Sequence, residues 1–331
     1  MGAIDFFWKI ESSPLLSTGN VLPVAAVLRS TVKMKIGFQF ARYRGSKKRV
    51  RTQSMKPIEN VTYWRDPGIE GIEICQVDGS RHVFPDHAHD GIYAIGMMES
   101  GGSYCLGPEK SYSLVSAGQI ALINPNQVHS GVPVPGKQIS YRMVYFDMRL
   151  MAAAAGEISR QPLTLPEFPF MVVGDPLLWR CLQRFCRVVQ GPGDQLEKES
   201  AIMDVMSHLV PFCSNIKPES RPLRNSGRSI RHAKAFLSEQ LDRKISLEEV
   251  ARTAGLSRYH FLRVFKRETG LPPHLFRTLR RIDQARQLLR DGQPLAQTAL
   301  TVGFSDQSHF TNTFRKYTGA TPGQYLSESS H

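Results

Sequence analysis

The sequence lacks several features that mark particular classes of protein. It has no run of about 18 apolar residues, so no membrane span is expected. Acidic residues close to the first Met, followed by only a short apolar run, make a poor secretory signal. Its cysteines are odd in number and contain no CxxC pair, which argues against a disulfide or zinc framework and favours a reducing cytoplasm. They are Cys75, Cys105, Cys181, Cys186 and Cys213.

Acidic residues are also scarce, and unevenly so. The 331 residues contain 42 Lys and Arg but only 29 Asp and Glu. Residues 61–220 carry 12 basic and 17 acidic residues, whereas residues 221–331 carry 19 and 9, and residues 1–60 carry 11 and 3. This asymmetry predicts a polyanionic partner for the C-terminal part, with an ordinary solvated surface as the alternative. The basic stretch 42–51 is expected to be a tail or loop, with direct DNA contact as the alternative reading, and Met34 is an alternative start.

One pattern, a glycine turn followed by an amphipathic helix, occurs twice near the C-terminus. The turns lie at Gly255 and Gly303, and each is followed by two Phe residues four positions apart. Five positions recur at an offset of 49 residues: Phe261/Phe310, Phe265/Phe314, Gly270/Gly319, Pro273/Pro322 and Phe276/Tyr325. The spacing predicts two helix–turn–helix units. A helix over residues 272–289 would separate them by about 27 Å, close to the roughly 34 Å between adjacent turns of one major groove.

The side chains outside these apolar stripes are of types that contact DNA. Arginine pairs with guanine edges, uncharged donor–acceptor side chains read bases, and a lysine near a helix end suits phosphates. In the first unit these residues are Arg258, Tyr259, Leu262, Arg263 and Lys266, and in the second they are Gln307, Ser308 and Asn312.

Residues 229–327 resemble the DNA-binding domain of the AraC/XylS family of bacterial transcription regulators. The resemblance is carried by ALTVGFSDQSHFTNTFRKYTGATPGQY, residues 299–325, and Thr298 departs from it, since the family usually has Ile or Val there. It implies activation of transcription through RNA polymerase. It also implies base-facing positions at Tyr259, Leu262 and Arg263, and at Gln307, Ser308, His309 and Asn312. For His309, the residues alone leave partial burial equally open.

Residues 70–150 alternate short β-rich runs with Gly, Pro, Asn and Asp, which predicts an all-β barrel or sandwich. His87-Ala88-His89 and the later run ending in His129 resemble the two cupin motifs, although Ile92 and Tyr93 stand where metal-binding cupins have glutamate. We therefore expect no metal and no cofactor, with a three-histidine metal site as the alternative. The favoured reading is a small-molecule effector pocket lined by His87, His89, Tyr93, Tyr104 and His129.

A helical hairpin is expected over residues 176–213, broken at Gly191-Pro192-Gly193, and a linker over residues 214–228. The hairpin either packs on the barrel or pairs with the same hairpin of a second chain to form a homodimer. The predicted order is a poorly defined basic segment (1–60), a cupin-like sensor domain (61–175), the hairpin, the linker and an AraC-type DNA-binding domain (229–327).

The predicted fold is therefore multidomain, with an N-terminal all-β cupin-like barrel and helical hairpin before an all-α double helix–turn–helix domain. The predicted function is a ligand-responsive activator, not an enzyme, that binds double-stranded DNA in the bacterial cytoplasm, on the nucleoid. Two alternatives remain: a metal-dependent cupin enzyme fused to a DNA-binding domain, and a constitutive DNA binder whose barrel only dimerises.

Overall fold

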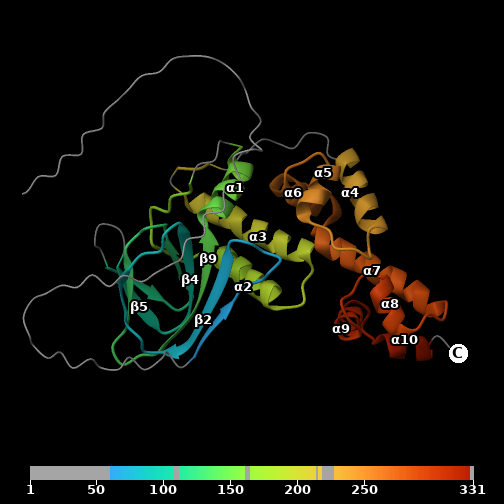
Figure 1. Ribbon diagram of the computed structural model, residues 1–331, viewed down its shortest axis with the longest axis horizontal. Coiled ribbons are helices and arrows are strands. Elements are labelled where there is room, and N and C mark those ends of the chain that lie inside the picture. Colours follow the sequence, from blue (N-terminus) through green and yellow to red (C-terminus); the bar gives the residue numbers. More distant parts are fainter. Residues whose placement is uncertain (1–59, 107–111, 161–164, 214, 218–226, 329–331) are drawn as a thin grey trace, which may run out of the picture. The chain divides into compact units, whose positions relative to one another are not determined.

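Figure 1 shows the computed structural model of the chain. It describes residues 60–106, 112–160, 165–213, 215–217 and 227–328. Met34, the basic stretch 42–51 and most of the expected linker lie outside these residues. In the described part, no helix is both long and apolar enough to cross a membrane.

In the part of the chain that the structure describes, ten antiparallel strands form two sheets, so the predicted all-β N-terminal domain is confirmed. One sheet has the order β1-β2-β9-β4-β7-β10 and the other β3-β8-β5-β6. The strands are β1 (Val61–Trp64), β2 (Ile72–Ser80), β3 (Phe84–His87), β4 (Ile92–Ser100), β5 (Gly102–Leu106), β6 (Tyr112–Ser116), β7 (Ile120–Ile123), β8 (His129–Pro133), β9 (Ile139–Asp147) and β10 (Val172–Val173).

Alternation along the strands of the six-stranded sheet gives its two faces different roles. Ile95 and Met97 of β4 and Phe146 of β9 belong to the large hydrophobic core that includes the neighbouring helices. Their neighbours Gly96 and Met143 line a cavity on the opposite face. One face of the sheet is thus core, and the other is one wall of a pocket.

Three helices pack against the core face: α1 (Met148–Ser159), α2 (Pro176–Gln190) and α3 (Gln195–Leu209). Helix α1 follows β9 directly and was not predicted from the sequence. Its N-cap is Asp147, whose carboxylate accepts a hydrogen bond from Arg149 N, and an alanine-rich run continues it. The sequence signal for this helix was therefore local, a cap followed by strong helix formers.

The hairpin of α2 and α3 has its apolar stripe buried within the chain. Leu178, Leu182 and Phe185 of α2 have no exposed surface, and neither do Leu196 and Val205 of α3. Of the two uses considered for the hairpin, the chain shows packing on the sheet, with α3 beside the β-rich domain in Figure 1.

The C-terminal part is all-helical, as predicted. Its helices are α4 (Gly227–Glu239), α5 (Leu247–Thr253), α6 (Arg258–Thr269), α7 (Pro273–Arg290), α8 (Leu295–Thr301), α9 (Gln307–Thr318) and α10 (Pro322–Glu328). Ser246 and Glu249 form a capping box before α5. Gly270 and Gly319 end α6 and α9 in the left-handed conformation.

Candidate functional site

The two glycine turns set the geometry of the two helix–turn–helix units. Gly255, with φ of +67°, joins α5 to α6, and Gly303, with φ of +83°, joins α8 to α9. A side chain at Gly255 would meet nothing within 4 Å, whereas one at Gly303 would collide with the carbonyl oxygen of Leu241. Gly303 is thus required both for its conformation and for its close approach to the loop after α4.

The second recognition helix, α9, has an open outer face. Asp306 caps it by accepting a hydrogen bond from His309 N at 2.7 Å. Gln307, Ser308 and Asn312 are exposed and surround a shallow depression in the surface. His309 is half-buried, with its ring 5.1 Å from the Phe304 ring, and burial lowers its pKa. Three of the four predicted base-reading side chains of α9 are therefore exposed at the surface.

The corresponding face of α6 is mostly covered. Tyr259 and Leu262 are only 7% and 9% exposed and belong to the same core cluster as residues of α1 and α3. Arg258 forms an ion pair with Glu157 of α1, with its Nε donating to Glu157 Oε1 at 2.8 Å. Of the five predicted residues, Arg263 and Lys266 are exposed. The structure thus places three of the five predicted DNA-contacting residues of α6 against the sensor helices, which are α1 and α3.

Arg263 is held in position by a neighbour on its own helix. Its guanidinium lies 5.3 Å from the centre of the Tyr259 ring, and its Nη1 donates to the Tyr259 hydroxyl at 3.2 Å. This stacked arrangement orients the planar guanidinium group of Arg263. It also reduces the side-chain entropy that would be lost on pairing with a base edge.

Helix α3 contacts the C-terminal domain at two further places. Glu199 accepts a hydrogen bond from Leu247 N at the start of α5, at 2.5 Å. Asp194, just before α3, pairs with Arg277 and Arg281 of α7 at 3.0 and 3.2 Å. Glu199 therefore lies at the positive end of α5, and Asp194 neutralises part of the charge of two arginines of α7.

Arg277 and Arg281 of α7 are buried, although arginine side chains usually lie at the surface. Arg277 is 1% exposed and donates to the carbonyl oxygens of Gln240 and Arg243 as well as to Asp194. The four-residue spacing of the two arginines, on the same face as the inward apolar residues, was the signal that could have revealed this.

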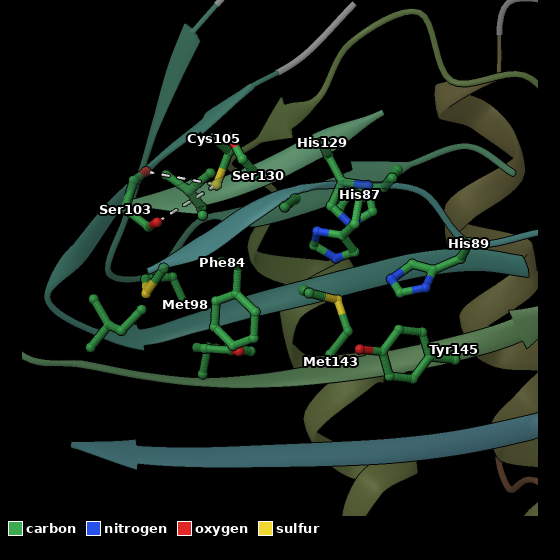
Figure 2. A pocket seen from close by; sticks show the side chains of 17 residues that line it. Phe84, His87, His89, Met98, Ser103, Cys105, His129, Ser130, Met143 and Tyr145 are labelled. Atoms are coloured by element: carbon green, nitrogen blue, oxygen red, sulfur yellow. Dashed lines mark hydrogen bonds between the residues drawn. The ribbon is translucent and has the colours of Figure 1, made fainter. Parts of the chain in front are cut away.

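A cavity of about 90 Å³ lies between the two sheets. His87, His89 and His129 gather at one part of it, beside Tyr145 and Met143, while Phe84 and Met98 line it further along (Figure 2). The Tyr145 ring is 5.3 Å from that of His89. Burial lowers the pKa of His129 to about 4, and that of His89 is lowered for the same reason, so both are neutral at pH 7.

Two predicted pocket residues lie outside this cavity. Tyr93 is 1% exposed and faces the helices, where its hydroxyl donates to the carbonyl oxygen of Pro166. Tyr104 is 42% exposed, whereas its neighbours Ser103 and Cys105 line the cavity. Both corrections follow from strand alternation, because a shift of one position moves a side chain to the other face. His87, His89 and His129 are brought together as expected.

Together, the fold and the two surfaces define a DNA-binding protein with two helix–turn–helix units and a β-sandwich sensor with an internal pocket. The comparisons with known proteins agree. Residues 67–206 match the family model of the AraC-like ligand binding domain, and residues 250–328 match that of the helix-turn-helix domain. The chain belongs to the AraC family of HTH-type transcriptional regulators.

Two of the similar relatives are matched over nearly all of their own length and a third over about half. An uncharacterized HTH-type transcriptional regulator of Bacillus subtilis is 30% identical over 76% of this chain and 90% of its own length. The thermoregulatory protein LcrF of Yersinia pestis is 26% identical over 76% of this chain and 95% of its own length. The melibiose operon regulatory protein of Escherichia coli is 28% identical over 44% of this chain and 51% of its own length.

Proposed function

We propose that this regulator reads adjacent major-groove segments with α6 and α9 and that a small molecule in the sensor pocket controls α6. The observation that carries the proposal is the contrast between the two outer faces. Gln307, Ser308 and Asn312 on α9 are exposed, whereas Tyr259 and Leu262 on α6 are buried beside α1 and α3. On this account the chain without effector binds DNA through α9, and full binding requires the sensor helices to release α6.

A continuous structural path supports control by the pocket. Met143 and Tyr145 of β9 line the cavity, and β9 passes directly into α1 at Met148. Near the other end of α1, Glu157 pairs with Arg258, and its Oε2 is buried with no hydrogen-bond partner among the described residues. An effector that displaces β9 would therefore shift the carboxylate that holds α6.

The test begins with an operator selected from random duplex DNA by the full-length chain. Wild type, Glu157→Lys and Asn312→Ala are then titrated with this operator. The proposal expects tighter binding by Glu157→Lys, because α6 is released, and weaker binding by Asn312→Ala. Equal affinities for all three chains would reject both the control of α6 and the role of α9.

We further propose that the chain activates transcription through RNA polymerase in the bacterial cytoplasm and is not an enzyme. The description of a Yersinia enterocolitica relative, 25% identical, as a virulence regulon transcriptional activator supports activation. Transcription in vitro from the selected operator, with and without the chain, tests this directly. Unchanged or reduced transcript on addition of Glu157→Lys would argue against an activator.

A homodimer remains a proposal, and it would need a surface other than the apolar stripe of α2 and α3, which is buried within the chain. Sedimentation with and without operator DNA measures the number of chains. A single chain on the operator would favour the reading in which the two helix–turn–helix units of one chain suffice.

A further inference from the structure

The three histidines of the pocket form a compact cluster from two parts of the barrel. His87 ends β3 and His129 begins β8, and the two are direct partners across the antiparallel pair. His89 follows His87 by two residues. Ring centres are separated by 4.2 Å for His87 and His129, 5.0 Å for His89 and His129, and 5.1 Å for His87 and His89. Each ring offers one nitrogen within 4.8 Å of those of the other two.

Backbone carbonyls fix the orientation of two of the rings. His87 Nδ1 lies 2.7 Å from the carbonyl oxygen of Pro85, and His129 Nδ1 lies 2.9 Å from that of Gln127. A carbonyl oxygen only accepts, so each Nδ1 carries the hydrogen and each Nε2 presents a lone pair. This is the arrangement of metal-binding imidazoles, whose second nitrogen donates to a carbonyl or carboxylate that holds the ring in place.

The lining of the cavity favours a metal cation over a proton as the partner of the three histidine nitrogens. Among the described residues that line the cavity there is no Asp, Glu, Lys or Arg. Lone pairs on adjacent imidazoles, without an acid to protonate them, are matched by a cation that binds all three at once.

We propose that His87, His89 and His129 bind one divalent transition-metal ion, with Zn²⁺ the leading candidate, and leave a fourth coordination position open to the cavity. Imidazole suits Zn²⁺, Cu²⁺, Ni²⁺ and Fe²⁺, and three histidines with an exchangeable fourth ligand form a recurring zinc site. Zn–N bonds of about 2.0–2.1 Å bring tetrahedral ligands to roughly 3.4 Å from one another. Small shifts of the half-buried His89 ring, and of His87 with its hydrogen bond to Pro85 kept, would close the difference.

The open position defines a chemical class of effector. The rest of the cavity is lined mainly by apolar and aromatic groups, including Phe84, Ile123, Met143 and Tyr145. A metal ion would supply the one full charge among the described lining residues. The matching effector is a small organic molecule with an apolar body and one metal-binding group, such as a carboxylate or thiolate. Only this last step rests on the proposed sensor function.

The test uses the full chain with any purification tag removed, stripped by a chelator and then titrated with Zn²⁺ and with Co²⁺. One ion per chain is expected, and Co²⁺ should give the intense visible absorption of a tetrahedral site. His89→Ala and His87→Ala should each weaken binding by at least about 100-fold, beyond the 10–100-fold typical of outer-shell changes. His129 is 5% exposed, so its variant is used only if circular dichroism shows native structure.

His82→Ala is the matched control. This histidine precedes the cluster by five residues, and its ring packs edge-on against Phe84 at 4.6 Å, but it is not one of the three clustered ligands. It should bind metal as the wild type does. Stoichiometric binding unchanged in His87→Ala and His89→Ala, or no binding by the wild type, would overturn the proposal.

Operator affinity, measured on the same samples, separates this inference from the proposed function. If the chain binds its operator but no metal, the proposed metal site is rejected and the proposed regulatory function stands. If the chain binds metal through the histidines but no DNA, the metal site stands and the proposed regulatory function is rejected.

Discussion

Helices α6 and α9 share one repeated sequence pattern but lie in different environments. Both follow a glycine turn, bury two Phe residues four apart and end in a left-handed glycine. Yet Tyr259 is 7% exposed, while Ser308 at the equivalent position is exposed. The repeat determines the fold of each unit, and the neighbours of each unit determine whether its reading face is accessible.

The largest expected difference between the units concerns their glycine turns. Gly303→Ala should lower the free energy of unfolding by more than about 3 kcal/mol, because a left-handed alanine would also collide with the Leu241 carbonyl. Gly255→Ala should cost only about 1 kcal/mol, since its surroundings are open. Urea unfolding measures both. Equal losses would mean that the second turn is not pressed against the loop after α4.

Base discrimination should also differ between the helices. In the Glu157→Lys background, which releases α6, Arg263→Ala should cost about 1–3 kcal/mol at one operator base pair, because its guanidinium can pair bidentately with guanine. Asn312→Ala should cost about 1 kcal/mol, since a neutral side chain discriminates less strongly. Titration against single-base operator variants measures both. No loss for Arg263→Ala would remove its base-reading role.

Reversing the charge of Glu157 should open the covered face. Glu157→Lys replaces an ion pair with a like-charge contact to Arg258 and should raise operator affinity without effector roughly tenfold, or about 1.4 kcal/mol. Glu248→Gln is the control, because Glu248 lies 3.8 Å from Arg258 and is far more exposed. Its effect should stay within about twofold, as for most surface pairs. Equal effects of the two variants would contradict the account.

The smallest expected effect concerns phosphate contacts at the helix ends. Lys266→Ala in α6 and Lys316→Ala in α9 should weaken binding to all sequences alike and reduce the salt slope by about 1 each. Without effector, Lys316→Ala should have the larger effect, since α9 then carries more of the binding. Affinities on specific and random duplexes over a range of salt concentrations measure this. A loss confined to one operator sequence would assign either lysine to base reading.

Local signals in the sequence predicted much of the fold. The 49-residue repeat, Ser246 with Glu249, and the closing glycines located the helices of the C-terminal domain. The histidines of the pocket were found from their resemblance to the two cupin motifs. Helix caps and closing glycines act over a few residues, so they can be identified without tertiary information.

Properties that depend on distant residues were not predictable in the same way. The cover of α6 depends on Glu157, 101 residues away, and the burial of Arg277 depends on Asp194, 83 residues away. Tyr93 and Tyr104 were assigned to the pocket because the phase of strand alternation was not known. Arg258, Tyr259 and Leu262 have the right chemistry for DNA, but in this state they contact the sensor helices.

The most direct test of the contrast between α6 and α9 is a hydroxyl-radical footprint of the full-length chain on its selected operator, without effector. Wild type should protect mainly the groove segment read by α9, and Glu157→Lys should protect two segments one helical turn apart. Full protection of both segments by the wild type, unchanged in Glu157→Lys, would contradict control of α6 by the sensor.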